Sequence, residues 1–122
     1  MRPGSSENCE GTTLIQVTVE FVLRPGAEQE FEKALKVMQE RVSQFEGYLG
    51  EEACQSITEE GKFVTIFYWR DREAMVAWRQ DPEHLKIQQL GREKIFAWYK
   101  IRVAEIEREY RWDERVIGTE PK

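Results

Sequence analysis

Residues 13–23 alternate between apolar and mixed side chains, and this alternation constrains the fold more than any other feature of the sequence. Every second side chain from Ile15 to Leu23 is apolar, whereas the intervening positions carry both polar and apolar groups. A period of two with many β-branched residues is typical of a β-strand. Because one face of this strand is wholly apolar, we expect helices to cover it.

A helix and two further strands follow. Apolar residues recur at three- and four-residue steps over 27–45, which predicts an amphipathic helix. Strands are expected over 49–58 and 62–70, and Gly61 in the turn between them can supply the positive φ that a hairpin requires. Both faces of the 62–70 strand are largely apolar, which indicates a central strand or one buried in an oligomer.

Two helix starts and a last strand complete the pattern. Asp71 and Asp81 suit the N-cap position, so we predict a short helix after Asp71 and a second helix over 82–96. Pro82 fits the first position of that second helix. Alternation returns over 98–112, and the resulting order is β-α-β-β-α-β. This order predicts an α+β fold of the ferredoxin-like type, with a four-stranded antiparallel sheet and helices on one face.

The sheet face opposite the helices is predicted to be apolar as well. It would carry seven apolar or aromatic side chains, namely Leu14, Val22, Val64, Ile66, Tyr68, Trp98 and Ile106. Such a face is too apolar to remain in water, so we expect a homodimer that stacks two of these faces. Glu20 would be buried in that interface and would need a partner such as Arg70 or Lys100.

Length, charge and hydropathy exclude several classes of protein. The 122 residues suit one domain over 13–112, with a flexible N-terminal arm (1–12) and a C-terminal tail (113–122). A net charge of −5 argues against a nucleic-acid partner. No apolar run is long enough to cross a bilayer, and the N-terminus lacks the apolar segment of a secretory signal. We therefore expect a cytoplasmic protein without a membrane partner.

Residues that usually build metal centres and hydrolytic sites are scarce. His84 is the sole histidine, and Cys9 and Cys54 lack the spacing of metal ligands, so we predict no metal site. A disulfide between the two cysteines is not expected. No serine has an evident triad partner, and the sequence has no glycine-rich phosphate-binding loop.

Four short motifs are spread over residues 12–112. They are Arg24-Pro25-Gly26, Phe45-Glu46-Gly47-Tyr48-Leu49-Gly50, Tyr68-Trp69-Arg70-Asp71-Arg72-Glu73-Ala74, and Ala77-Trp78-Arg79 with His84 after it. In these motifs the chain resembles the antibiotic biosynthesis monooxygenase superfamily of dimeric α/β-barrels. The resemblance implies a pocket between the sheet and the helices that cover it.

The resemblance also implies two kinds of chemistry. Some members of the superfamily oxidise polyphenolic aromatic molecules with O2 and neither metal nor flavin, whereas others bind and degrade haem. The haem-degrading branch resembles this chain at Trp78, but its pocket asparagine falls at Val19 and its haem-ligating histidine at Gln88 in an ungapped comparison. We therefore expect no cofactor, with haem as the disfavoured alternative.

His84 and Tyr99 are the predicted catalytic residues. His84 lies in the first turn of its helix, where the positive end of the helix dipole favours a neutral imidazole that can act as a base. Tyr99 is predicted to point to the helix-covered face of the sheet, where its hydroxyl can donate a hydrogen bond to a phenolate. The alternative for His84 is a structural role as a helix cap or as a packing residue under Trp78.

Five further residues are predicted to bind the substrate: Trp78, Trp69, Phe67, Thr65 and Arg92. The Trp78 indole can stack on a planar aromatic ligand, and Arg92 can stabilise an oxyanion. The alternative is again structural, because strand aromatics commonly fill cores and arginines commonly face solvent.

These residues lead to one main hypothesis and two alternatives. The main hypothesis is a monooxygenase-like protein that binds a small planar aromatic molecule, such as a polyphenol or quinol, and oxygenates it without a cofactor. The alternatives are haem binding or degradation, and a non-catalytic dimeric ligand-binding domain. A cavity bounded by Thr65, Phe67, Trp78 and His84 would distinguish a binding site from a packed core.

Overall fold

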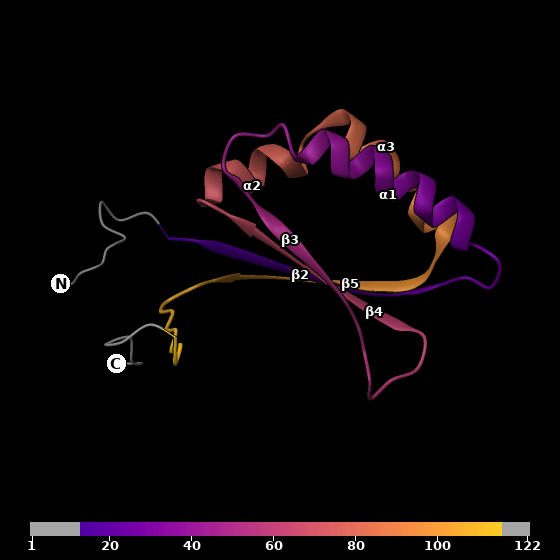
Figure 1. Cartoon of the computed structure of the whole chain (residues 1–122). Coiled ribbons are helices and arrows are strands. Elements are labelled where there is room, and N and C mark those ends of the chain that lie inside the picture. Colours follow the sequence, from indigo (N-terminus) through magenta and orange to yellow (C-terminus); the bar gives the residue numbers. More distant parts are fainter. Residues whose placement is uncertain (1–12, 116–122) are drawn as a thin grey trace.

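The computed structural model describes residues 13–115, which form one four-stranded sheet with three helices on a single face (Figure 1). Its elements are β2 (Ile15–Leu23), α1 (Glu28–Val42), β3 (Tyr48–Gln55), β4 (Lys62–Trp69), α2 (Arg72–Arg79), α3 (Pro82–Leu90), the π-helical turn η2 (Gly91–Ile95) and β5 (Phe96–Glu105). This order confirms the predicted ferredoxin-like α+β fold. The predicted arm (1–12) and most of the tail (116–122) lie outside the described residues.

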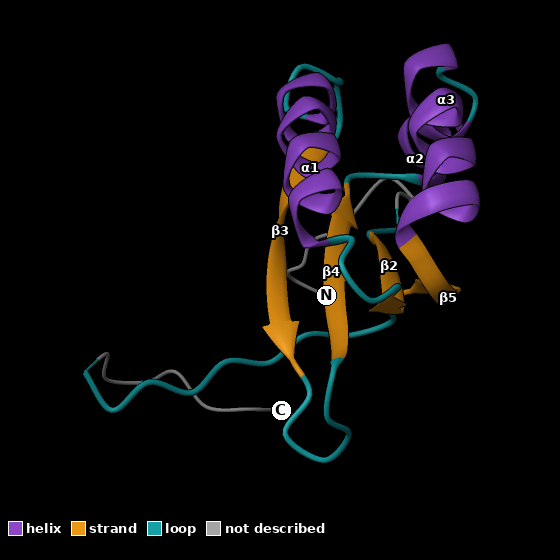
Figure 2. Cartoon of the chain, turned by 90° about the vertical axis from the view of Figure 1, so that its right-hand side faces the viewer, coloured by secondary structure: helices purple, strands orange, loops and turns teal. Residues whose placement is uncertain are grey.

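The sheet is antiparallel and open, with strand order β3-β4-β2-β5, so β3 and β5 form its two edges. Figure 2 shows α1 above the β3–β4 half of the sheet and α2 and α3 above the β2–β5 half. Val17 of β2 lies opposite Phe67 of β4 and Val103 of β5. Because side chains alternate between faces, these three point together toward the helices, as the alternation of β2 predicted.

The predicted helix over 82–96 is wrong in its second half. Regular α-helix ends at Leu90, and Gly91–Ile95 form a π-helical turn. Gly91 packs against the Phe96 ring so closely that a Cβ atom there would lie 2.6 Å from a ring carbon. The backbone N–H of Arg24 also donates to the Ile95 carbonyl at 2.8 Å. These contacts with β5 and with the end of β2 set the shape of the turn, and periodicity within the helix does not report them.

The predicted last strand is also too long. β5 begins at Phe96 rather than Trp98 and ends at Glu105 rather than Trp112. Among the described strands its one neighbour is β2, whose first residue, Ile15, lies opposite Glu105. One further hydrogen bond, from the Ile106 N–H to the Leu14 carbonyl (2.9 Å), ends the ladder. The strand stops because its partner stops.

The remaining boundaries differ from the predictions by a few residues. α1 spans Glu28–Val42 instead of 27–45, and β3 spans Tyr48–Gln55 instead of 49–58. After β3, the Ser56 N–H donates to the Lys62 carbonyl at 3.0 Å, which closes the hairpin before the predicted strand end. Helix and strand ends are the least determined by local sequence, because caps and neighbours decide them.

A cluster of buried hydrophobic residues lies between the sheet and the helices. Ile15, Trp69, Met75 and Val42 are buried there together with Ala74 and Trp78. The Trp69 ring packs against Tyr48 at 5.3 Å and against Trp78 at 6.4 Å between ring centroids. This cluster joins the end of β4 to α1 and α2.

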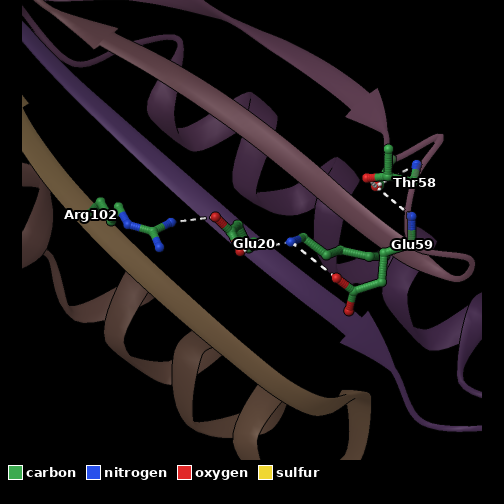
Figure 3. A network of polar contacts seen from close by, with 6 residues as sticks. Glu20, Thr58, Glu59 and Arg102 are labelled. Atoms are coloured by element: carbon green, nitrogen blue, oxygen red, sulfur yellow. Dashed lines mark hydrogen bonds and ion pairs between the residues drawn. The ribbon is translucent and has the colours of Figure 1, made fainter.

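The outer face of the sheet carries an ion-pair cluster that corrects the partners predicted for Glu20. Figure 3 shows Glu20 of β2 with Arg102 of β5 on one side, and the Lys62 ammonium of β4 lies 3.0 Å from the other carboxylate oxygen. Lys100 lies directly opposite Glu20 in the register, but Arg102 and Lys62 are diagonal neighbours that long side chains can reach. Hydrogen bonds from Lys62 and Arg102 lower the pKa of Glu20. Arg70 instead pairs with Asp71 and Glu46.

Candidate functional site

A cavity of about 550 Å³ lies between the inner face of the sheet and the helices. Its wall is mostly aliphatic and aromatic, with a few polar side chains from α2, α3, β4 and β5. The lining residues are Val17, Val19, Phe21, Phe31, Leu35, Met38, Thr65, Phe67, Trp69, Met75, Trp78, Arg79, His84, Leu85, Gln88, Phe96, Tyr99, Ile101 and Val103. The cavity therefore occupies the place that the family resemblance implied, between the sheet and the helices.

β4 supplies one part of the cavity floor, with Thr65, Phe67 and Trp69 on the inner face as predicted. Thr65 and Phe67 are partly buried, but Trp69 is only 1% exposed and packs against two other aromatic rings. Trp69 is thus chiefly a core residue that borders the cavity. Thr65 and Phe67 are the residues of this strand that a ligand can contact most freely.

Two helix starts place Trp78 and His84 above this floor. The Asp71 carboxylate accepts a hydrogen bond from the Ala74 N–H at 2.9 Å, and Asp81 accepts one from the His84 N–H at 3.1 Å. Both N-caps are confirmed, and together they set the turn between α2 and α3. The imidazole of His84 stacks on the indole of Trp78 with 4.3 Å between ring centroids and 12° between planes.

The hydrogen bond of the His84 ring determines its tautomer. Nδ1 lies 3.0 Å from the Trp78 carbonyl oxygen, which can only accept a hydrogen bond, so Nδ1 must carry the proton. Nε2 therefore holds the lone pair of the neutral ring. Burial lowers the pKa of His84, and its hydrogen bond to the Trp78 carbonyl opposes the shift only in part. The ring is consequently neutral at physiological pH and presents a basic nitrogen.

Asp81 is held by a contact that the sequence did not predict. Arg41, near the end of α1, donates two hydrogen bonds to its carboxylate, from Nη2 at 2.7 Å and from Nε at 3.2 Å. Asp81 is 6% exposed, and the hydrogen bond from Arg41 lowers the pKa of its carboxyl. This pair ties α1 to the turn that carries His84, although the two residues are 40 positions apart.

Replacing Asp81 with alanine should lower the free energy of unfolding by about 1–2 kcal/mol, because an N-cap is lost. The pKa of Asp81 is lower in the folded than in the unfolded chain, so its stabilising contribution is complete above its unfolded pKa of about 3.9 and declines as the pH falls further. Urea denaturation at pH 7 and pH 3 measures both effects. An equal loss at both pH values would contradict the role of the ionised carboxylate. The exposed acid Glu60→Ala is the matched control.

Tyr99 and Arg92 meet at another part of the cavity. Tyr99 lines the wall from β5, and Arg92 of η2 donates from Nη1 to the Tyr99 hydroxyl oxygen at 3.2 Å. Arg92 does not line the wall itself and reaches the cavity through Tyr99. Arg24 binds this turn through its guanidinium. Nη2 donates to the Arg92 carbonyl at 2.6 Å, and Nε donates to the Phe96 carbonyl at 3.0 Å.

Sequence reasoning missed two polar residues of the wall. Arg79 ends α2, and Gln88 lies one turn after His84 on the same face of α3. The spacing of four residues between His84 and Gln88 was a usable signal for this shared face. Val19 and Gln88, where the haem-degrading branch carries asparagine and histidine, both line the cavity.

Comparisons with known proteins agree with this fold. Residues 14–90, more than half of the chain, match the family model described as antibiotic biosynthesis monooxygenase. An uncharacterised protein, YqjZ of Bacillus subtilis, is 31% identical over 68 residues, which cover 56% of this chain and 58% of YqjZ. Jasmonate monooxygenase ABM of Pyricularia oryzae is 26% identical over 79 residues, which cover 65% of this chain and 37% of that protein. The chain thus spans less than two thirds of the length of either relative.

Solved structures support the same fold. SnoaB, a cofactor-independent oxygenase from Streptomyces nogalater, superposes with a TM-score of 0.67 at 15% identity and covers 80% of this chain and 96% of SnoaB. A conserved protein from Methanosarcina mazei gives a TM-score of 0.68 at 18% identity, with 76% and 92% covered. No helix among residues 13–115 is long and apolar enough to cross a membrane. The fold, the motifs and the match over residues 14–90 together establish that the chain belongs to the antibiotic biosynthesis monooxygenase family.

Proposed function

We propose that the cavity binds a small planar aromatic molecule with an acidic phenol or enol, and that the protein oxygenates this molecule with O2 and no cofactor. The observation that carries the proposal is the neutral His84, which lines a mostly apolar cavity and whose Nε2 atom holds the lone pair. An apolar wall suits both the ring system of such a substrate and O2. Burial keeps the imidazole unprotonated and therefore able to accept a proton.

The proposed reaction begins with proton transfer from the substrate hydroxyl to Nε2 of His84. The resulting phenolate transfers one electron to O2, which gives a substrate radical and superoxide. Their recombination forms a C–O bond, and the resulting peroxide anion takes the proton back from His84 to give a hydroperoxide. The hydrogen on the carbon that bears the hydroperoxide then leaves with the distal oxygen as water, which gives a ketone. One oxygen atom of O2 enters the product and the other leaves as water, so no external reductant is needed.

The named activities of two similar proteins support the proposed oxygenation. SnoaB is described as a cofactor-independent oxygenase, and the Pyricularia oryzae relative is named as a monooxygenase of jasmonate. Trp78, Phe67 and Thr65 would contact the substrate ring, because they line the same cavity as His84. Tyr99 and Arg92 would bind a second polar group of the substrate.

An oxygen-isotope experiment tests the proposal. The protein, treated with a chelator, is incubated with an anthrone under ¹⁸O2, and the product is examined by mass spectrometry together with oxygen uptake. We expect one ¹⁸O atom in each product molecule and one O2 consumed per ketone formed. An absence of uptake above a protein-free control, or oxygen derived from water, would overturn the proposal. Binding of the anthrone without uptake would instead support the non-catalytic alternative.

Haem is the second candidate ligand. The hydrogen bond from Nδ1 of His84 to a backbone carbonyl is of the kind that metal-bound histidines usually make, and it leaves Nε2 available to an iron ion. The positions at which the haem-degrading branch has its asparagine and histidine are Val19 and Gln88, and neither side chain ligates iron readily. We therefore expect that a haemin titration gives no saturable Soret shift, and that any shift is the same in His84→Ala. A shift that saturates and depends on His84 would favour haem over the phenol.

We also propose a homodimer that covers the outer face of the sheet. Val22, Val64, Ile66 and Tyr68 lie on that face in the strand register, and the neighbouring Trp98 is 39% exposed. Covering these side chains removes apolar surface from water, and the ion pairs of Glu20 would help to fix the register of the two sheets. Sedimentation equilibrium should give a mass of two chains, and Ile66→Lys should shift it to one. A monomeric wild-type protein would contradict the dimer.

A further inference from the structure

The Arg92–Tyr99 pair has the composition of an anion-binding site. The Tyr99 hydroxyl oxygen accepts the hydrogen bond from Arg92, so its own proton is directed to another acceptor. Within residues 13–115 the Arg92 guanidinium pairs with no carboxylate. Glu93, the acid on the same turn, accepts instead from Gln89 at 3.1 Å. A cation and a hydroxyl donor are thus presented together beside an apolar cavity.

Arg24 makes three hydrogen bonds to the turn that carries Arg92 and to the residue after it. Arg24 bonds to the carbonyls of Arg92 and Phe96 through its guanidinium and to that of Ile95 through its N–H. Carbonyls at the end of a helix carry partial negative charge, which would repel an anion. The Arg24 guanidinium satisfies two carbonyls there and offsets this charge. π-helical turns are rare and are frequent at functional sites.

Tyr99 and His84 lie toward opposite ends of the cavity. Tyr99 lies opposite Phe21 of β2, whereas Trp69 lies opposite Ile15 of the same strand. Phe21 and Ile15 are six residues apart, which is roughly 20 Å along a strand. His84 belongs to the Trp69 end, because it stacks on Trp78, which packs against Trp69. A ligand that reaches both groups must therefore extend along the cavity, with its two polar ends separated by an apolar body.

We propose that the ligand of this cavity is an apolar carboxylic acid whose carboxylate binds the Tyr99 hydroxyl and the Arg92 guanidinium. The carboxylate accepts one hydrogen bond from Tyr99 and one from an Arg92 N–H, and the ring system extends over Phe21 toward His84. This assignment deepens the proposed function, since it rests on the same cavity and names the group that orients the substrate. The reacting hydroxyl then lies at the end remote from the carboxylate.

Arg79 is the competing cation, because it lines the cavity at the His84 end. It is the last residue of α2, where the carbonyl end of the helix disfavours an anion. A carboxylate bound there would also occupy the space beside His84 in which the reacting group must lie. Arg92 lacks this conflict.

Calorimetric titration with 2-naphthoate and its neutral isostere 2-naphthamide tests the assignment. We expect the wild-type protein to bind the naphthoate more tightly. Tyr99→Phe and Arg92→Gln should each weaken naphthoate binding by about 10- to 100-fold, the effect of losing a hydrogen bond to a charged group, with little change for the naphthamide. Arg79→Gln is the matched control and should retain the preference for the acid.

The outcomes separate this assignment from the proposed reaction. His84→Ala should keep the preference for naphthoate, since binding does not require the base, and circular dichroism should show that each variant is folded. The carboxylate assignment is overturned if the wild-type protein binds both ligands equally or neither, or if Arg79→Gln removes the preference. His84-dependent oxygen uptake in such a case would leave the reaction intact, whereas a preserved preference without uptake would remove the reaction alone.

Discussion

Replacing His84 with alanine is expected to lower the kcat/KM of oxygen consumption on an anthrone by about 10²- to 10⁴-fold, the usual contribution of a general base. The Nε2 atom is the proposed proton acceptor, and Nδ1 is committed to the Trp78 carbonyl. Water that enters the vacated space has no comparable basicity. The ring also stacks on Trp78, so the variant should be compared with wild type by thermal unfolding before rates are interpreted.

The pH profile distinguishes a base from a packing residue. Only the neutral imidazole accepts a proton, so the wild-type rate should fall as the pH drops below the pKa of His84. Burial places that pKa below the ordinary value of 6.5, so activity should be maintained through neutrality into mildly acidic solution. In His84→Ala the acidic limb due to this residue should disappear. Lys86→Ala, on the exposed side of α3, should change neither rate nor profile. A His84→Ala rate within twofold of wild type would contradict the assignment.

The parts of the fold that sequence predicted correctly depend on short-range patterns. The alternation of β2 assigned Val17 and Phe21 to the helix-covered face, and both line the cavity. Asp71 and Asp81 marked helix starts, because an N-cap acts within three residues of itself. The positions of Trp78 and His84 followed from these starts.

The errors arise where distant residues determine local structure. α3 ends early because Gly91 packs on Phe96 and because Arg24 binds two backbone carbonyls there. Arg24 is 68 positions from Arg92 and 72 positions from Phe96, whose carbonyls accept these hydrogen bonds. β5 ends early because β2 begins at Ile15. The pair of Arg41 with Asp81 joins α1 to α3 in the same way. Periodicity and caps carry no information about such contacts.

The candidate site shows the same division. Strand parity alone predicted that Thr65, Phe67 and Tyr99 would share the inner face, and all three line the cavity. Their grouping along the cavity depends on the strand register and on the path of the chain from α3 to β5, which separate Tyr99 from the His84 end. The tautomer of His84 likewise depends on the position of one backbone carbonyl. Roles that require three-dimensional placement could therefore not be assigned from sequence.

Trp69→Ala is expected to lower the free energy of unfolding by about 3–5 kcal/mol, the usual loss when a buried tryptophan is truncated. Trp69 is 1% exposed and contacts Tyr48 and Trp78 within the cluster that joins β4 to α1 and α2. The surrounding side chains belong to two neighbouring strands, β2 and β3, and to two helices, so they can close only part of the space left behind. A domain of this size is commonly stable by about 5–15 kcal/mol, so the variant should unfold at a much lower urea concentration.

Trp112→Ala provides the matched control for that experiment. Trp112 is 57% exposed and lies beyond the end of β5, so its loss should change the free energy of unfolding by about 0.5 kcal/mol or less. Both variants are measured by urea denaturation at one protein concentration, because a dimer would make the midpoint depend on concentration. Trp69→Phe should recover much of the loss, since a smaller ring still contacts Tyr48. A loss of less than about 1 kcal/mol in Trp69→Ala would show that the indole faces open cavity, as a residue that serves mainly to bind substrate would.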